Sequence, residues 1–329
     1  MNIATIGTGS IVELFLSAVE EVDGTQCVAV YSRKEESAER LADKFDIAAI
    51  YTDMNEMMEN TAIDFVYIAS PNSLHFEHAH LALKNGKNVI CEKPFTSTVR
   101  EAEQLAELAK EKQLMIFEAI STIHMPNYKL ISKHLESLGP IKMVQCNYSQ
   151  FSSRYEKLMN GETPNVFNPE FSGGALADIN IYNLHFVLNL FGRPEQISYT
   201  ANKHPNGIDT SGIAVMKYPN FIAECVGAKD SQSMNFAMIQ GEKGYLNVLN
   251  GANGCQEIII SIGDREIRLN AQTKTNRLYY EVAEFQKIYQ EKDYERCYAL
   301  LDYTQSVMEV LVAARIDGGV VFPADESNQ

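Results

Sequence analysis

The sequence predicts a two-domain protein, with an N-terminal α/β domain on a doubly wound parallel sheet and a C-terminal α+β domain on a mostly antiparallel open sheet. Apolar runs and amphipathic helical stretches alternate over residues 1–120, and the alternation stops there. Short β-like runs joined by turn residues then follow from 195 to 270. A chain of 329 residues can bury two hydrophobic cores, so we predict domains at 1–120 and 121–329.

The N-terminal domain repeats a strand–helix unit. Apolar runs predict strands at 2–6, 26–31, 47–51, 64–69, 87–91 and 114–118. Amphipathic spacing predicts helices at 11–21, 35–44, 53–60, 74–85 and 98–112. Ser97 or Thr98 can cap the last of these helices together with Glu101 in a capping box. Strand and helix in turn imply right-handed βαβ units and therefore a Rossmann-type sheet.

The C-terminal domain has a different rhythm. Its helices are predicted at 126–138, from Gly173 to Phe191, at 277–291 and at 297–316. Its strands are predicted at 141–151, 196–202, 211–217, 221–227, 234–239, 244–249, 256–262 and 265–269. Turn signals such as Tyr218-Pro219-Asn220 separate consecutive strands, which indicates a largely antiparallel sheet.

Composition narrows the class of partner. The chain has 28 Lys and Arg against 43 Asp and Glu, and this net charge of −15 disfavours nucleic acid and anionic membranes as partners. No apolar run approaches the roughly 20 residues of a membrane helix, so we expect no membrane span. Residues 2–6 already have the pattern of a strand, so we expect no signal peptide. The six cysteines are scattered without metal-ligand spacing, so we expect reduced thiols, a cytoplasmic location and no metal site.

A glycine-containing loop follows the first predicted strand. Gly7 and Gly9 allow a tight turn and a close approach of the backbone to a pyrophosphate, which the helix N-terminus at Ser10 and Ile11 would stabilise. Val12 stands where the usual fingerprint has its third glycine. Because the loop lies between a strand and a helix, it predicts a dinucleotide site.

The residues after the second strand bear on which dinucleotide binds. An acidic residue there would bind the ribose 2′-hydroxyl of NAD, whereas this chain has Ser32 and Arg33. A hydroxyl and a guanidinium can bind a 2′-phosphate, and the arginine can also stack on adenine. We predict NADP as the preferred cofactor and NAD as the alternative; an ordinary cationic helix start is the competing interpretation.

Two further loops lie at the carboxyl ends of predicted strands, where open parallel sheets bind ligands. The predicted cofactor residues in these loops are Ser70, Pro71, Asn72, His75, Glu92 and Lys93. We expect His75 to hydrogen-bond locally. Lys93 is fixed by the following Pro94, so its ammonium can hydrogen-bond a substrate oxygen and stabilise developing negative charge.

A glycine-led helix of the second domain carries a polar stripe. Asp178, Tyr182, His185 and Asn189 recur at i, i+4, i+7 and i+11, which places them on one face of a regular helix. The other positions of this helix are largely apolar. Such a stripe faces either solvent or a ligand cleft, and the spacing alone favours neither.

Four motifs together resemble one oxidoreductase family. Gly-x-Gly begins at Gly7, Ser-Pro-Asn-x-x-His spans 70–75, Glu-Lys-Pro spans 92–94, and Gly-Gly-Ala-Leu-x-Asp-x-x-x-Tyr spans 173–182. Over the whole chain this combination is similar to the glucose–fructose oxidoreductase/inositol dehydrogenase/MocA (Gfo/Idh/MocA) family. Tyr182 resembles the branch that contains dimeric dihydrodiol dehydrogenase, and Asn180 replaces a glycine usual in the family.

The resemblance implies hydride transfer between a nicotinamide and a secondary alcohol or ketone of a sugar, polyol or related dihydrodiol. It also implies that Lys93 and Asp178 are catalytic, that the Lys93–Pro94 bond is cis, and that the open C-terminal sheet forms a homodimer or a dimer of dimers. We expect Tyr182 to exchange the hydroxyl proton, Asp178 to orient the lysine or the substrate, and His185 to bind a neighbouring hydroxyl.

Two other functions fit the same fold. A sugar sensor would bind NADP without catalysis, and an NAD-assisted glycosidase would release an aglycone without net formation of NADH. Retention of Lys93, Asp178 and Tyr182 together argues against the sensor. The substrate itself is not predicted, because we expect its pocket walls to come from loops around 119–128 and 150–172.

Overall fold

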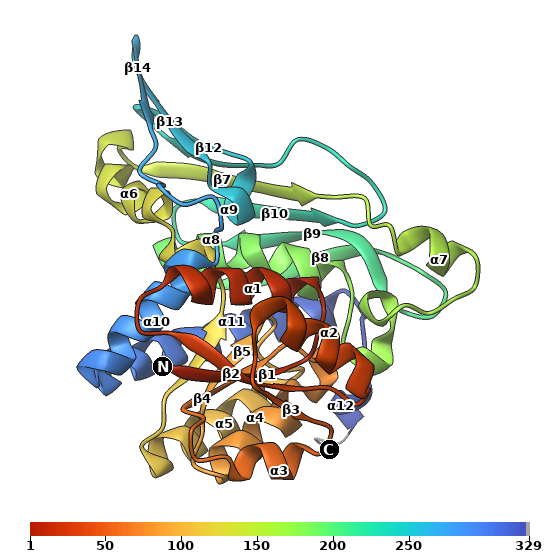
Figure 1. Cartoon of the computed structure of the whole chain (residues 1–329). Coiled ribbons are helices and arrows are strands. Elements are labelled where there is room, and N and C mark those ends of the chain that lie inside the picture. The colour runs from red at the N-terminus through yellow and green to blue at the C-terminus, as the bar shows by residue number, and fades with distance from the viewer. Residues whose placement is uncertain (327–329) are drawn as a thin grey trace. The chain divides into compact units, whose positions relative to one another are not determined.

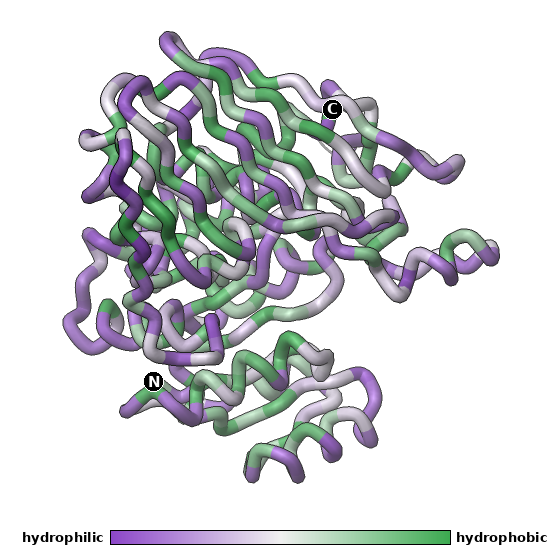
Figure 2. Tube along the Cα trace, turned by 90° about the horizontal axis from the view of Figure 1, so that it is seen from above, coloured by the Kyte–Doolittle hydropathy of each residue, from purple (hydrophilic) through white to green (hydrophobic). Residues whose placement is uncertain are grey.

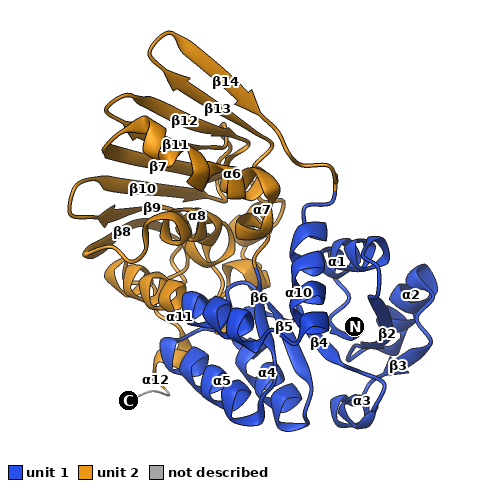
Figure 3. Cartoon of the chain, turned by 90° about the vertical axis from the view of Figure 1, so that its left-hand side faces the viewer, with its two compact units in different colours: residues 1–119, 276–305 blue, residues 120–275, 306–329 orange. Residues whose placement is uncertain are grey.

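The computed structural model describes residues 1–326, which divide into two compact units. The first contains residues 1–119 and 276–305, and the second contains 120–275 and the chain from 306 onwards (Figure 3). The first crossing between the units therefore falls at the predicted division near residue 120. Residues 276–305 return to the first unit, so the units are not the two contiguous stretches expected from the sequence.

A six-stranded parallel sheet forms the first unit, in the order β3-β2-β1-β4-β5-β6 (Figure 1). Its strands are β1 (Asn2–Ile6), β2 (Gln26–Tyr31), β3 (Ala49–Tyr51), β4 (Phe65–Ile68), β5 (Asn88–Glu92) and β6 (Ile116–Ala119). The helices between them are α1 (Ser10–Glu21), α2 (Glu35–Phe45), α3 (Met54–Glu59), α4 (His75–Lys84) and α5 (Val99–Lys112). The predicted Rossmann sheet is confirmed.

Aromatic packing explains why the chain returns to the first unit at α10 (Tyr279–Glu291). Phe285 of this helix stacks on Phe117 of β6 with the ring centroids 4.4 Å apart, and both rings are buried. Val282 and Ile288 join the same hydrophobic core. Burying apolar area contributes about 25 cal/mol per Å², so the Phe117 ring of β6 is better covered by a distant helix than left in water.

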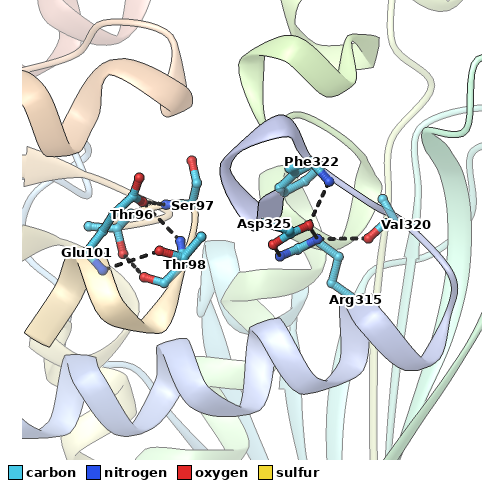
Figure 4. Close-up of polar contacts among 8 residues, drawn as sticks. All are labelled: Thr96, Ser97, Thr98, Glu101, Arg315, Val320, Phe322 and Asp325. Carbon is cyan, nitrogen blue, oxygen red and sulfur yellow. Dashed lines mark hydrogen bonds and ion pairs between the residues drawn. The ribbon is translucent and has the colours of Figure 1, made fainter. Parts of the chain in front are cut away.

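Helix α5 begins with the predicted capping box. Thr98 Oγ1 accepts from the N–H of Glu101 at 3.3 Å, and the Glu101 carboxylate accepts from the N–H of Thr98 at 3.1 Å (Figure 4). The same carboxylate accepts from the N–H of Ser97 at 2.9 Å. These bonds fix the chain shortly after the Lys93 loop.

An eight-stranded sheet forms the second unit, in the order β14-β13-β12-β11-β7-β10-β9-β8. Its strands are β7 (Ile141–Ser149), β8 (Gln196–Lys203), β9 (Asp209–Lys217), β10 (Ile222–Ala228), β11 (Phe236–Gly241), β12 (Gly244–Leu249), β13 (Glu257–Ile262) and β14 (Arg265–Leu269). Only β7 and β10 pair in parallel within this sheet, which confirms the mostly antiparallel prediction. Hydrophobic and hydrophilic residues both occur along its strands (Figure 2), and exposed and buried positions alternate in the second half of β9.

The helices of the second unit include one irregular turn that matters for the site. The regular helices are α6 (Pro126–His134), α7 (Tyr155–Met159), α8 (Ile181–Phe191), α9 (Gly251–Gly254) and α12 (Pro323–Glu326), while α11 (Tyr294–Asp317) begins in the first unit and ends in the second. A π-helical turn, Leu176–Asn180, precedes α8 and carries Asp178. Over residues 1–326, the helices are all too short or too polar to cross a membrane.

The C-terminal segment is fixed to the second unit by Arg315. Its guanidinium donates to the two carboxylate oxygens of Asp325 at 2.7 and 2.6 Å and to the carbonyl of Val320 at 2.8 Å (Figure 4). It also lies 4.2 Å from the ring centroid of Phe322. Five residues around this point form a small buried core: Leu158, Phe167, Ile208, Val320 and Phe322. This core supports part of the 150–172 segment, which the sequence assigns to the substrate pocket.

Candidate active site

The glycine loop lies where three neighbouring strands end. The Gly7 N–H donates to the carbonyl of Tyr31 at the end of β2 at 3.3 Å, and the N–H of Ala69 after β4 donates to Ile6 at 2.9 Å. Gly7 has a φ of +116°, and a Cβ built on it would lie 2.7 Å from the Ala69 carbonyl oxygen, so only glycine fits. Because β2, β1 and β4 are adjacent, the predicted cofactor loops after these strands share one edge of the sheet.

The N-terminus of α1 offers the amides that a pyrophosphate needs. Gly9 is its N-cap, and a Cβ built on Gly9 meets nothing within 4 Å. Ser10 is exposed and Ile11 is partly buried. Val12, in the place of the third glycine, is fully buried in the hydrophobic core. The loop therefore has the open backbone and the helix N-terminus that suit a dinucleotide.

Ser32 and Arg33 follow β2 at this same edge. Ser32 Oγ accepts from the N–H of Lys34 at 3.2 Å, which fixes the turn before α2, and a hydroxyl that accepts keeps its proton to donate. Arg33 is exposed. Burial is the main cause of the lowered pKa of His78; Glu77 acts to raise this pKa, and the charge of Arg33 lowers it as well. A hydroxyl and a guanidinium thus lie where a ribose 2′-phosphate is expected.

His75 ties together the loops after β4 and β5. Its imidazole is buried, with Nδ1 2.9 Å from the Pro94 carbonyl oxygen and Nε2 3.0 Å from the Ser70 carbonyl oxygen. Burial lowers the pKa of His75 to about 4, although both backbone contacts act to raise it. In the neutral form that this pKa favours, the ring has a single N–H, so it donates to one of the two carbonyl oxygens and only contacts the other, in line with the local role expected for it. Pro71 and Asn72 lie beside it in the same partly buried loop.

Lys93 follows β5, and its peptide bond to Pro94 is cis, as the resemblance implied. The preceding Glu92, 7% exposed, accepts from the hydroxyl of Tyr67 at 2.6 Å and from the N–H of Lys93 at 3.3 Å. Burial raises the pKa of Glu92, while Lys93, Tyr67 and Arg277 lower it. Glu92 is thus a buried anchor of the Lys93 main chain.

Asp178 lies on the π-helical turn before α8 and forms an ion pair with Lys229, the residue after β10. The aspartate side chain is 31% exposed and that of the lysine 10%. The sequence analysis did not identify Lys229. It lies 51 residues from Asp178, and a lysine beside a turn is usually a solvated surface charge.

Tyr182 lies within α8, and its ring meets that of Tyr148 of β7 edge-on with the centroids 5.9 Å apart. Tyr182 is 6% exposed, His185 is completely buried and Asn189 is exposed. The residues of the predicted polar stripe therefore lie in different environments, some buried and some exposed to solvent. The π-helical turn, with its wider i→i+5 spacing, takes Asp178 out of the register of α8. Tyr182, His185 and Asn189 all lie on α8 itself, where the exposed Asn189 is close to the C-terminal end of the helix.

Two family models match the chain. The model described as "Oxidoreductase family, NAD-binding Rossmann fold" matches residues 1–120, and the model described as "GFO/IDH/MocA C-terminal domain" matches residues 134–247. The chain belongs to the Gfo/Idh/MocA oxidoreductase family. It is an NAD(P)-dependent oxidoreductase, and its residues 1–120 form the NAD-binding Rossmann fold.

Relatives in this family align along the full chain. "Uncharacterized oxidoreductase YgjR" of Escherichia coli (strain K12) is 37% identical over 99% of this chain and 98% of its own length. "scyllo-inositol 2-dehydrogenase (NADP(+)) IolU" of Bacillus subtilis (strain 168) is 33% identical over 99% of this chain and 100% of its own. The solved structure of KijD10, a 3-ketoreductase from Actinomadura kijaniata in complex with NADP and TDP-benzene, superposes with a TM-score of 0.87 at 20% identity. That superposition covers 96% of this chain and 97% of KijD10, and it concerns the fold alone.

In this Gfo/Idh/MocA protein a second buried glutamate, which sequence reasoning also missed, anchors the Lys93 loop. Glu118 of β6, 5% exposed, accepts from the N–H of Phe95 at 3.2 Å and from the hydroxyl of Thr304 at 3.0 Å. Glu92 and Glu118 therefore bond the main chain on both sides of Pro94. The sequence does contain one signal for this role, because Glu118 is the charged last residue of the apolar run at 114–118. A carboxylate that is buried with such a strand needs hydrogen-bond partners.

Helix α10 adds a third carboxyl, that of Glu281, to this part of the first unit. Glu281 is fully buried, and across residues 1–326 neither of its oxygens has a hydrogen-bond partner. Burial raises the pKa of Glu281 well above its ordinary value; Glu92 and Glu118 act in the same direction, and Arg277 acts against them. The structure therefore favours the neutral form of Glu281.

We expect Glu281→Gln to stabilise the protein increasingly as the pH rises. The pKa of this carboxyl is higher in the folded state than in the unfolded state, where it is about 4.3. Its contribution to stability is complete below the unfolded pKa and is lost as the pH rises through the folded pKa, by at most about 1.4 kcal/mol per pH unit. Glutamine has no such loss. Urea unfolding of both proteins at about pH 5 and about pH 8 measures the difference.

Glu291→Gln is the matched control, because Glu291 is exposed at the end of the same helix. Its stability relative to wild type should not depend on pH in this way. A constant advantage of Glu281→Gln at both pH values would contradict a raised pKa at Glu281.

Proposed function

We propose that this oxidoreductase transfers a hydride between NADP and a secondary alcohol or ketone of a sugar, a polyol or a related dihydrodiol. The observation that carries the proposal is the Lys93 loop, whose main chain is held by two buried glutamates at the carboxyl end of β5. The name of IolU, an NADP-dependent inositol dehydrogenase, supports the substrate class and the cofactor.

The first unit would hold the cofactor. The main-chain amides of Gly7, Gly9, Ser10 and Ile11 would bind the pyrophosphate, and Ser32 and Arg33 the 2′-phosphate. The remaining proposed cofactor residues shape the two following loops: Ser70, Pro71, Asn72, His75, Glu92 and Lys93. When bound, the nicotinamide supplies the hydride acceptor or donor.

The proton chemistry would fall to side chains of the chain itself. The Lys93 ammonium donates to the substrate oxygen and stabilises the negative charge that develops there. Tyr182 takes the hydroxyl proton in oxidation and returns it in reduction. Asp178 accepts a hydrogen bond from the substrate and orients it, and His185 remains a proposed partner of a neighbouring hydroxyl.

A substrate screen tests this function. Polyols, aldoses and trans-dihydrodiols are offered with NADP⁺ and with NAD⁺ in parallel, and the near-ultraviolet absorbance of the reduced nicotinamide is followed. We expect turnover of at least one sugar or polyol, faster with NADP⁺. NADP binding without any turnover would indicate a sugar sensor instead. Release of an aglycone without net formation of reduced cofactor would indicate an NAD-assisted glycosidase.

The cofactor preference is proposed to rest on Arg33. We expect a lower Kd for NADP than for NAD, and a loss of about 10- to 100-fold in NADP affinity in Arg33→Ala, because hydrogen bonds between charged groups contribute about 1.5–3 kcal/mol. NAD affinity should change less than about threefold, since NAD lacks the 2′-phosphate. Calorimetric titration measures all four constants. Arg40→Ala removes another exposed charge, from α2, and is the control; weaker binding of NADP than of NAD by the wild type would refute the preference.

We also propose a homodimer, or a dimer of such dimers, through the open face of the eight-stranded sheet. Large apolar side chains are exposed along this face: Met143, Ile213, Val215, Ile222 and Tyr245. Met143 and Ile222 are direct cross-strand partners, so these two side chains are adjacent on this face, and exposed apolar groups of this kind are often covered by subunits. A cytoplasmic location stays a proposal, with which the six free thiols agree.

A further inference from the structure

The ion pair of Asp178 and Lys229 brings a second lysine to the proposed substrate residues of the second unit. Lys229 Nζ contacts Asp178 Oδ2, and only 10% of the lysine side chain is exposed. Removing an ammonium from water costs several kcal/mol, and one ion pair offsets this only in part. A lysine is almost never buried unless it is paired, and Asp178 is the partner here.

Main-chain bonds hold Lys229 in place without any help from its side chain. Its N–H donates to the carbonyl of Thr210 at 2.8 Å, and its carbonyl accepts from the N–H of Ser152 at 2.9 Å. The next residue, Asp230, accepts from the hydroxyls of Thr210 and Ser211 at 2.7 and 2.8 Å. The main chain of Lys229 is thus fixed between the start of β9 and the start of the 150–172 segment, and the ion pair with Asp178 pre-organises its side chain before a ligand arrives.

The turn that carries Asp178 is docked on the strand that leads to Lys229. The side-chain amides of Asn180 and Asn183 donate to the carbonyls of Cys225 and Val226, both at 2.9 Å. The close approach depends on Gly227, because a Cβ there would lie 2.6 Å from the Asn180 Cβ. Asn180, which replaces the usual glycine, therefore fixes Asp178 relative to Lys229.

We propose that Lys229 is a substrate-binding residue that, together with Asp178, binds two hydroxyl groups on adjacent carbons. An ammonium has three N–H donors, so one bond to Asp178 leaves two for oxygen acceptors. The carboxylate accepts only, and its side chain is 31% exposed. A hydroxyl both donates and accepts, so one hydroxyl can donate to Asp178 while its neighbour accepts from Lys229. The ligand class is therefore a vicinal diol.

This inference deepens the proposed function and rests on it for the carbon that reacts, but diol binding requires no turnover. Binding and catalysis can therefore be measured separately. The probes are scyllo-inositol, in which every carbon of a six-membered ring bears a hydroxyl, and cyclohexanol, which has the same ring with a single hydroxyl. Their dissociation constants are measured on the NADP-loaded protein by ligand-observed NMR, which detects weak binding.

Lys229→Met should weaken scyllo-inositol binding about 10- to 100-fold, because hydrogen bonds from the charged group to the neighbouring hydroxyl are lost. Cyclohexanol and NADP affinities should change less than about threefold, since neither ligand needs that donor. With a turned-over polyol, KM should rise more than kcat falls. Lys229→Gln keeps one amide donor without the charge, and its loss should be intermediate.

Lys142→Met is the matched control, because it removes a lysine of the same unit from an exposed ion pair with Glu242, in which both side chains are 54% exposed. It should leave both ring ligands unaffected. Equal losses for scyllo-inositol and cyclohexanol, or no loss for either, in Lys229→Met and Lys229→Gln would overturn the inference. Lys229-dependent diol binding in a protein that oxidises no diol would uphold it and refute the proposed function. Polyol turnover together with polyol binding that does not depend on Lys229 would support the proposed function and refute the inference.

Discussion

Replacement of Lys93 by methionine should lower kcat about 100- to 1,000-fold, which is the usual effect of removing one donor aimed at a developing oxyanion. The loop itself should survive the change. Its main chain is held by the bonds of Glu92 to the Lys93 N–H and of Glu118 to the Phe95 N–H, and neither involves the ammonium. The thermal midpoint and the Kd for NADP should therefore stay close to the wild-type values.

Initial rates at saturating NADP⁺ and polyol measure kcat, calorimetric titration measures the Kd for NADP, and thermal unfolding measures the midpoint. Lys112→Met is the control, because Lys112 is an exposed lysine at the end of α5 in the same unit. Full activity of Lys93→Met with normal NADP binding would remove the lysine from the mechanism.

A second consequence of the Lys93→Met substitution can be followed spectroscopically. Lys93 lowers the pKa of Glu92, so the variant should protonate Glu92 at a higher pH than the wild type.

Replacement of Tyr182 by phenylalanine should lower kcat about 100- to 10,000-fold, the range that general acid–base groups contribute. The ring remains, and with it the edge-on contact with Tyr148, so folding should be little affected. Tyr182→Phe differs from Lys93→Met in removing only a hydroxyl, so it takes away the proposed proton-exchanging group without changing the charge of the side chain. NADP binding should be unchanged in both.

Tyr148→Phe is the matched control for this substitution. The Tyr148 hydroxyl donates to Gln150 at 3.1 Å and accepts from Asn253 at 2.9 Å, so it has local partners of its own. Its loss should cost less than about tenfold in kcat, the effect of one ordinary hydrogen bond. Equal losses of kcat in the two variants would indicate that Tyr182 acts through packing. Full turnover in Tyr182→Phe would show that another group exchanges the proton.

Much of the cofactor side could be predicted because its residues follow strands in chain order. Gly7, Ser32, Ser70 and Lys93 each come shortly after a strand of one parallel sheet. A parallel sheet brings all such positions to one edge, so a local pattern predicts a three-dimensional neighbourhood. The capping box at Thr98 was equally predictable, since both partners lie within one helical turn.

The contacts that hold these residues could not be predicted in the same way. Glu118 meets Thr304 across 186 residues, and Asp178 meets Lys229 across 51. Hydrophobic periodicity states which side of an element is covered, but not which element covers it. For the same reason the return of 276–305 to the first unit was missed, although α10 itself was predicted.

The sequence by itself determined the Rossmann sheet, the family and the place of Lys93 after β5, because each depends on residues close together in the chain. Tertiary structure decided what surrounds those residues. It placed Glu92, Glu118 and Glu281 in the interior of the first unit, and it inserted a π-helical turn that separates Asp178 from the helical stripe and pairs it with Lys229. The physical reason is desolvation. A charged group that leaves water must find partners wherever the fold brings them, whatever their distance along the chain, or become neutral, as the raised pKa of Glu281 favours.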